Sequence, residues 1–232
     1  MVKESLDADQ QALWLERTRA KPGVEGVRPV RVLEQGSGSY VMELLSGRLV
    51  ADIDDPGTLG ECVTRLIDQV AAWASAPADN DADWESYLRR LSAHAEYAQS
   101  DVARRAVDLV RDLPPFPRSW CHGDLTLENV IRDHRGLVLF DPNYSPDLYQ
   151  SHVLDYGKIL QSTHTSFHRL LSPRDGACSA VDALVERLLR ERGVYEQAVQ
   201  ACLTHAVRLL RHWPGKEHSV EAIIVTLLDD LR

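Results

Sequence analysis

Three polar side chains, Asp124, Asn129 and Asp141, lie at the ends of two short apolar segments near the middle of the chain. Two carboxylates and a carboxamide in this arrangement suit phosphoryl transfer, because hard oxygen ligands hold Mg²⁺ on nucleotide phosphates. In such a site an aspartate separate from the metal ligands orients the attacking hydroxyl and accepts its proton. The residue types therefore indicate a magnesium-dependent phosphoryl-transfer site.

A β-hairpin is the element that must position these side chains. Residues 130–131 form one predicted strand and residues 137–140 form its partner, joined by four polar residues that end in glycine. Antiparallel pairing would bring Asn129 and Asp141 to the same end of the hairpin. Asp124 lies just upstream, in the loop that leads into it.

The segment HGDLTLENV at 122–130, followed by LFDP at 139–142, resembles the catalytic loop and metal-binding segment of the aminoglycoside phosphotransferase and choline kinase group. These are small-molecule kinases related to protein kinases, and their loop reads roughly H-G-D-x-x-x-x-N. Protein kinases have H-R-D-x-x-x-x-N and D-F-G instead, whereas Pro142 and Asn143 follow the aspartate here. The resemblance implies a two-lobed, protein kinase-like α+β fold with an abbreviated small β lobe and a mostly helical large lobe.

The resemblance also implies ATP- and Mg²⁺-dependent phosphorylation of a hydroxyl on a small molecule of aminoglycoside, sugar or amino-alcohol type. Asp124 would be the catalytic base, and Asn129 and Asp141 would bind Mg²⁺. The alternative interpretations are a surface turn in which Asp124 is a cap, and a metal-dependent hydrolase built on His122 and Asp124.

Two further residues would support the loop. His122 belongs to the catalytic segment, and a bracing role through hydrogen bonds is favoured over proton transfer because the family uses the aspartate as its base. Asp155, in the segment LDYGK, resembles a family aspartate that braces the loop from the following helix. A helix N-cap or a surface carboxylate is the alternative for Asp155, and Asp147 is close enough to compete for its role.

The small lobe is predicted to occupy residues 1–46 and the helical lobe residues 47–232. The first contains a predicted helix at 12–20 and predicted strands at 27–33 and 40–45. The GSG sequence between the two strands is interpreted as a hairpin turn rather than a phosphate-binding loop, because no helix follows it.

Nucleotide-binding residues are expected in the small lobe. Lys3 lies where the family's phosphate-binding lysine would be, just before the first helix, and Glu16 on that helix could pair with it; the alternative is a disordered tail. The strand at 40–45 resembles the one that leads into the kinase hinge, whose backbone groups bond the adenine edge. The candidate residues for this contact are Met42, Glu43, Leu44 and Leu45. The alternative is a plain core strand followed by a linker.

The glycine-rich loop that covers the phosphates in related kinases has no counterpart in this sequence. Three explanations remain: a start upstream of Met1, a degenerate and non-catalytic nucleotide- or ligand-binding protein, or a second polypeptide that completes the lobe. The first strand would then be an exposed edge, which either pairs in a homodimer or with a partner chain, or is mobile; mobility is the favoured interpretation.

Helices should fill the second lobe. A capping-box pattern from Thr58 to Glu61 opens the first of them, and an acidic, proline-containing stretch at 77–83 ends it. Two amphipathic helices should follow around residues 84–91 and 102–110. The remaining predicted helices cover residues 149–170, 179–192, 195–212 and 219–231.

Composition restricts the partners. The net charge of −9 and the absence of a basic stripe argue against nucleic-acid binding, and no segment has the length and apolarity of a membrane span. Four scattered cysteines favour reduced thiols and a cytoplasmic location. The acidic tracts at 52–55 and 79–83 would either attract a cationic acceptor or lie in solvated loops, and the second interpretation is favoured.

Overall fold

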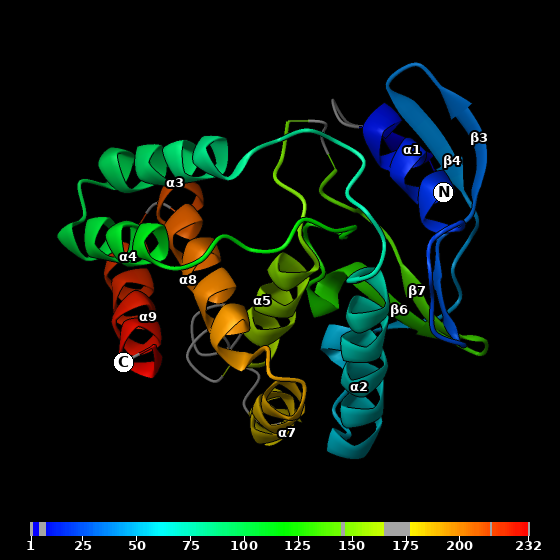
Figure 1. Cartoon of the computed structure of the whole chain (residues 1–232). Coiled ribbons are helices and arrows are strands. Elements are labelled where there is room, and N and C mark those ends of the chain that lie inside the picture. The colour runs from blue at the N-terminus through cyan, green and yellow to red at the C-terminus, as the bar shows by residue number, and fades with distance from the viewer. Residues whose placement is uncertain (1, 5–7, 145–146, 165–176, 214, 232) are drawn as a thin grey trace.

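The structure, a computed structural model, describes residues 2–4, 8–144, 147–164, 177–213 and 215–231 (Figure 1). The helices are α1 (Ala8–Thr18), α2 (Pro56–Trp73), α3 (Trp84–Ala98), α4 (Asp101–Asp112), α5 (His152–Thr163), α7 (Ala177–Glu191), α8 (Tyr195–His212) and α9 (Glu217–Asp230). The strands are β1 (Val2–Glu4), β2 (Val27–Pro29), β3 (Val32–Gly36), β4 (Ser39–Met42), β5 (Arg48–Leu49), β6 (Val130–Asp133) and β7 (Gly136–Leu139).

Two small sheets accompany the helices. One has the strand order β1-β4-β3 and lies against α1, and the other has the order β2-β7-β6-β5 (Figure 1). In the second sheet β6 and β7 pair antiparallel, with Val130 opposite Leu139. The predicted hairpin is therefore confirmed, and the turn between β3 and β4 lies where the GSG sequence predicted it.

The predicted single strand over residues 27–33 is wrong, because this segment divides between the two sheets. β2 pairs in parallel with β7, with Val27 opposite Leu137, and the Val30 N–H continues the ladder to the Leu139 carbonyl at 2.8 Å. β3 then pairs with β4 in the other sheet. β2, from residues 1–46, thus belongs to the sheet that contains the β6–β7 hairpin. The lobe boundary after residue 46 remains a prediction.

Local capping explains where the helices begin. The predicted cap at Thr58 is wrong: α2 begins two residues earlier, and Asp55 is its N-cap, accepting the Thr58 N–H at 2.7 Å. Pro56 occupies the first helical position, where its missing N–H costs nothing. The later part of the helix predicted at 149–170 lies outside the described residues.

Three tryptophans fasten α1 to the rest of the molecule. The Trp14 ring stacks on Trp120 with centroids 5.9 Å apart and meets the edge of Trp73 at 6.0 Å. Its Nε1 donates to the Cys121 carbonyl at 2.7 Å, so the polar atom of this fully buried ring is satisfied. Helix α1 is thereby held against α2 and against the segment that precedes residue 122.

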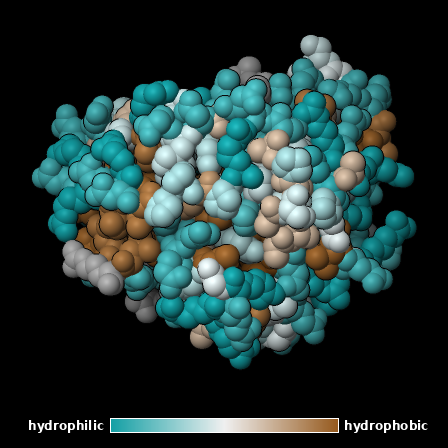
Figure 2. Space-filling view, in the orientation of Figure 1, coloured by the Kyte–Doolittle hydropathy of each residue, from teal (hydrophilic) through white to brown (hydrophobic). Residues whose placement is uncertain are grey.

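The surface is mostly hydrophilic on the face shown in Figure 2, with hydrophobic side chains gathered beside α4 and α9. Within the described ranges, no helix is long and apolar enough to cross a membrane.

β1 lies at one edge of its sheet, as expected for the first strand, and a partner for this edge remains a prediction.

Helix α5 packs on α8 through a close approach at Gly157. A Cβ at this position would lie 2.6 Å from the Ala201 Cβ and 2.7 Å from the Cys202 nitrogen, distances that a real side chain does not reach. Glycine is therefore required here for the spacing of two buried helices.

We predict that Gly157→Ala destabilises the protein by ~1–3 kcal/mol, because the added methyl group forces the helices apart. Thermal unfolding followed by circular dichroism measures the change. Gly57→Ala, in the first turn of α2, is the matched control, because the nearest atom to its Cβ is an Asp55 oxygen at an ordinary 3.4 Å. Equal stability of the two variants would contradict this packing argument.

Candidate active site

The loop at residues 122–129, called the HGD loop below, is held at its start by the buried carboxylate of Asp155. One oxygen accepts the His122 N–H at 2.6 Å and the other accepts the Gly123 N–H at 2.9 Å. Burial raises the pKa of Asp155 to about 7, although these two donors favour the charged form. Ser151 is the N-cap of α5, so Asp155 acts from within the helix and not as its cap.

The His122 side chain is fully buried and joins the HGD loop to the end of β7. Its Nε2 lies 3.1 Å from the Phe140 carbonyl, and its ring meets the edge of Trp14 with centroids 5.0 Å apart. Because a carbonyl only accepts, Nε2 carries the proton in this contact. Burial lowers the pKa of His122 to about 4 and keeps the ring neutral. This environment favours the bracing role over proton transfer.

Backbone conformation ties the HGD loop to residues 141–143. Gly123 has φ +79°, and a Cβ there would lie 2.4 Å from the Asn143 carbonyl oxygen, so only glycine fits. The Asn143 N–H in turn donates to the His122 carbonyl at 3.0 Å. Asp141 has φ +55°, which is uncommon for a residue with a side chain and often marks a functional position.

Asp124 contacts two other polar side chains. Asn129 Nδ2 donates to the Asp124 carbonyl at 2.8 Å and to its carboxylate at 3.0 Å. The ammonium of Lys158, one helical turn after Asp155 on α5, lies 2.9 Å from the other carboxylate oxygen. Burial pushes the pKa of Asp124 upward, but the charge and hydrogen bond of Lys158 hold it below its ordinary value. Asp124 is therefore ionised at neutral pH.

Asp141 lies at the same end of the hairpin as Asn129, as predicted, and meets helix α1. Its Oδ1 accepts a hydrogen bond from Gln11 Nε2 at 2.8 Å. Gln11 Oε1 accepts from the Tyr40 hydroxyl at 3.4 Å, and burial together with the charge of Asp141 raises the pKa of Tyr40 to about 12. Helix α1 thus reaches the carboxylate directly, and the first sheet reaches it through Gln11.

The donor set suits Mg²⁺ that is shared with a nucleotide. Asn129 directs its Nδ2 toward Asp124, which leaves its Oδ1 as the atom to face a cation, and its carbonyl accepts the Phe140 N–H at 3.1 Å. Among the described residues, no group of three or more His, Cys, Asp or Glu could hold a metal alone. Mg²⁺ commonly takes one or two carboxylates and completes its shell with phosphates and water.

The predicted phosphate-binding residues are only partly described. Lys3 lies on β1, opposite Tyr40 in the sheet register, and its side chain is outside the described part. Glu16 is exposed on α1, whereas Gln11 on the same helix faces Asp141. Pairing between Lys3 and Glu16 remains a prediction.

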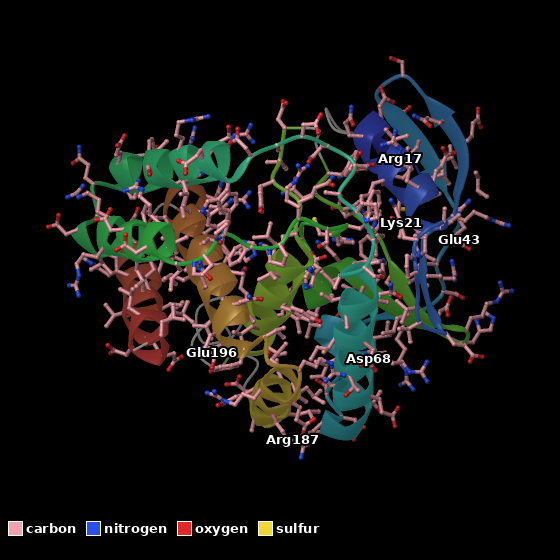
Figure 3. The ribbon with its side chains drawn as sticks, viewed as in Figure 1. Arg17, Lys21, Glu43, Asp68, Arg187 and Glu196 are labelled. Carbon is pink, nitrogen blue, oxygen red and sulfur yellow. The ribbon has the colours of Figure 1, made fainter. Side chains whose placement is uncertain are left out.

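The predicted hinge follows directly from β4. Met42 is buried, Leu45 packs on the core, and the Leu44 side chain is 80% exposed. The Glu43 N–H donates to the Arg31 carbonyl at 2.9 Å, and its carboxylate, labelled in Figure 3, accepts from Arg28 and from the Arg31 N–H. The Glu43 N–H thus already has a backbone acceptor, and contact of the hinge with adenine remains a prediction.

Sequence reasoning missed two residues of the site, Gln11 and Lys158. The position of Lys158, three residues after Asp155 and so on the same side of a helix, was the available signal. Gln11 carries no comparable signal, because its contact with Asp141 depends on how α1 packs.

Comparison with known proteins finds a family whose model matches more than half of the chain. The family model described as the phosphotransferase enzyme family matches residues 3–145. No curated protein matches the chain significantly in sequence.

Three solved structures illustrate the likeness of fold. A thermostable mutant of aminoglycoside phosphotransferase APH(4)-Ia is 13% identical with a TM-score of 0.63, covering 99% of this chain and 85% of its own. Glucosamine kinase in complex with glucosamine, ADP and inorganic phosphate is 17% identical with a TM-score of 0.57, covering 100% and 72%. A choline/ethanolamine kinase family protein from Mesorhizobium loti is 13% identical with a TM-score of 0.55, covering 98% and 81%. The predicted kinase-like α+β fold is confirmed.

We predict that Lys158→Met raises the pKa of Asp124, because the variant removes the charge that holds this pKa down. The wild-type pair stabilises the fold above pH 3.8, and that contribution disappears as the pH falls through the lower folded-state pKa. A ¹³C NMR titration of the Asp124 carboxyl group measures the shift. Lys21→Met, which removes a charge from above the Trp120 ring, is the control. An unchanged pKa in Lys158→Met would contradict the electrostatic coupling.

Proposed function

The chain belongs to the phosphotransferase enzyme family, and from this premise we propose that it transfers the γ-phosphoryl group of ATP to a hydroxyl of a small molecule. The observation that carries the proposal is the HGD loop braced by Asp155. This loop brings Asp124 and Asn129 into hydrogen-bonding contact beside the strand end that carries Asp141. A base and two oxygen ligands at one hairpin end meet the needs of phosphoryl transfer.

In the proposed reaction Asp124 orients the acceptor hydroxyl and accepts its proton. The hydroxyl oxygen forms a bond to the γ-phosphorus while the bond from that phosphorus to the bridging oxygen breaks, and ADP leaves. Lys158 keeps Asp124 ionised before the reaction, and it lies close enough to stabilise negative charge near the same carboxylate.

Asn129 and Asp141 are the proposed ligands of Mg²⁺. When bound, this ion would neutralise charge on the nucleotide phosphates. Gln11 fixes the Asp141 carboxylate from α1, and the strained backbone at residue 141 sets the direction of the side chain. The ADP in the glucosamine kinase complex supports nucleotide use by a protein of this fold. Lys3, Glu16 and the 42–45 segment are the proposed nucleotide contacts.

The metal ligands give the first test of this function. We predict that ATP binds more tightly with Mg²⁺ than without it, and that Asp141→Ala removes this difference because one of two protein ligands is lost. Isothermal titration calorimetry with and without Mg²⁺ measures both affinities. Asp108→Ala, on the exposed face of α4, is the control. If ATP binds equally well with and without Mg²⁺ in both the wild type and Asp141→Ala, the proposed metal site is refuted.

The base gives the second test. Asp124→Asn keeps the size of the side chain but cannot accept the proton, so turnover should fall by ~10²–10⁴-fold on any acceptor that a screen of hydroxylated small molecules identifies. Affinity for Mg²⁺-ATP should change little, because Asp124 acts on the acceptor. Asp108→Asn serves as the control. A fully active Asp124→Asn protein would refute the assigned role.

A further inference from the structure

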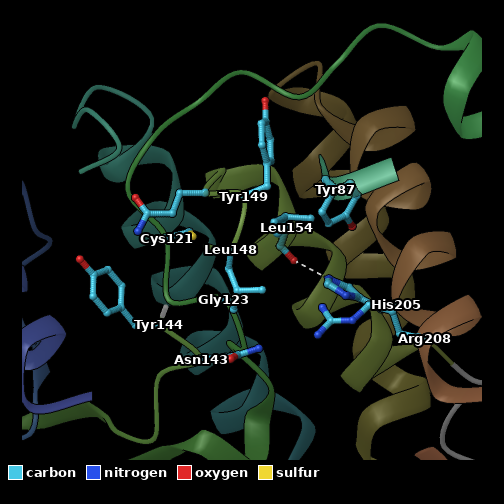
Figure 4. Close-up of a pocket in the computed structure, with 11 residues that line it drawn as sticks. Tyr87, Cys121, Gly123, Asn143, Tyr144, Leu148, Tyr149, Leu154, His205 and Arg208 are labelled. Atoms are coloured by element: carbon cyan, nitrogen blue, oxygen red, sulfur yellow. Dashed lines mark hydrogen bonds between the residues drawn. The ribbon is translucent and has the colours of Figure 1, made fainter. Parts of the chain in front are cut away.

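A pocket opens at the HGD loop and is lined there by Gly123, the residue before Asp124. Its inner part is lined by Gly123 and Asn143, and it runs outward between α3 and α8 past Tyr87 and Tyr149 (Figure 4). A second cavity shares Tyr87, Tyr149 and Arg208 with the first and continues it outward. A molecule bound along this path would present one end to the catalytic loop, which is where the proposed function requires an acceptor.

Arg208 is the cationic residue that lines both parts of the pocket. It lies on α8 and is half-buried, and no hydrogen bond or ion pair of its side chain is found among the described residues. Taking a guanidinium partly out of water without a counter-charge is unfavourable. The planar fork of arginine matches a carboxylate or a phosphate group. Arg208 therefore offers an anionic group of a ligand a cationic binding partner.

The surroundings of Arg208 add positive charge. Arg90 lines the outer part, and Arg211 lies on the same helix as Arg208. Burial, followed by the charge of Arg208, lowers the pKa of His94 to about 4, so this histidine stays neutral. Asp147 is the acidic residue of the outer lining. Two arginines against one aspartate leave the lining positive, in a protein whose net charge is −9.

His205, one of the residues that line the pocket, carries a hydrogen-bond acceptor without a partner. The residue is 2% exposed, and its Nε2 lies 3.0 Å from the Leu154 carbonyl, so Nε2 carries the proton (Figure 4). Burial lowers the pKa of this ring well below its ordinary value, which leaves Nδ1 with a lone pair. Nδ1 is buried and has no partner in the described part of the protein. A ligand hydroxyl could donate to it.

The acidic tracts that might have attracted a cationic acceptor are largely engaged elsewhere. Asp79 binds Arg17 on α1 at 2.5 Å and also accepts from Tyr144. Asp55 and Asp83 are the N-caps of α2 and α3. These carboxylates stabilise the fold, and none of the three lines the pocket at the HGD loop.

We propose that the acceptor is a small polyhydroxylated molecule that carries a carboxylate or phosphate group. Arg208 binds the anionic group, His205 Nδ1 accepts from one hydroxyl, and a second hydroxyl reaches Asp124. This inference rests on the proposed phosphotransferase function for the last contact alone. The proposed acceptor carries a negative charge, whereas glucosamine, the ligand in the glucosamine kinase complex, is an amine.

Matched ligand series test the charge preference without any turnover. Glucose, glucosamine, gluconate and glucose 6-phosphate form one series, and glycerol, serinol, glycerate and glycerol 3-phosphate form the other. Calorimetry on the full chain should give at least one anionic member an affinity about tenfold or more above its neutral and amine analogues. Comparison of gluconate or glycerate with the phosphate esters identifies which anion is preferred. Tighter binding of the amine, or no binding by any anion, would overturn the proposal.

Variants of Arg208 then locate the preference. Arg208→Gln should lose the anion preference by about tenfold or more, and Arg208→Lys should recover part of it. Arg211→Gln removes the same charge from α8 without touching the lining and should keep the preference. An anion preference unchanged in Arg208→Gln would refute the assignment.

Mg²⁺-ATP binding, measured on the same proteins, separates this inference from the proposed function. Arg208→Gln should keep its affinity for Mg²⁺-ATP. If it loses that affinity and still binds the anions, Arg208 is a nucleotide contact and the acceptor proposal fails. If the wild type binds the anions but no Mg²⁺-ATP, the anion pocket stands and the phosphotransferase function fails.

Discussion

The buried carboxylate of Asp155 is the interaction on which the site depends. It spans the N–H groups of His122 and Gly123 with its two oxygens, and so fixes the direction in which the chain enters the HGD loop. Backbone donors buried this deeply are costly to leave unpaired, so the loop has little freedom to adopt another shape. Asp124 follows immediately, so the brace sets where its backbone lies, and Lys158 and Asn129 hold its carboxylate. The left-handed conformation of Gly123 and the close Asn143 carbonyl complete this constraint.

A second constraint comes from how α1 packs. The ring of Trp14 binds the Cys121 carbonyl and lies against the His122 ring, while Gln11 on the same helix holds Asp141. One helix therefore contacts both the start of the HGD loop and the proposed metal ligand. Movement of α1 would disturb both groups together, which couples the arrangement of the first sheet to the chemistry proposed for the hairpin.

The parts of the molecule that local patterns determine could be predicted from the sequence. The hairpin and the shared end of Asn129 and Asp141 follow from two apolar runs around a polar turn. The strand predicted at 27–33 failed because its division depends on a parallel partner, β7, that lies far away in the sequence. The contact of Gln11 with Asp141 and the place of Arg208 in the pocket lining depend on helix packing, which residue spacing does not encode. Lys158 was within reach of a helical-periodicity argument from Asp155.

The central claim is that Asn129 and Asp141 hold the metal ion of a bound nucleotide beside Asp124. A crystal structure with a non-hydrolysable ATP analogue and Mn²⁺, which marks the Mg²⁺ site by anomalous scattering, tests it most directly. The account predicts an anomalous peak at about 2.1 Å from side-chain oxygens of both residues and in contact with the phosphates. A nucleotide bound with its metal away from both residues, with Asp141 still bonded to Gln11 alone, would contradict it.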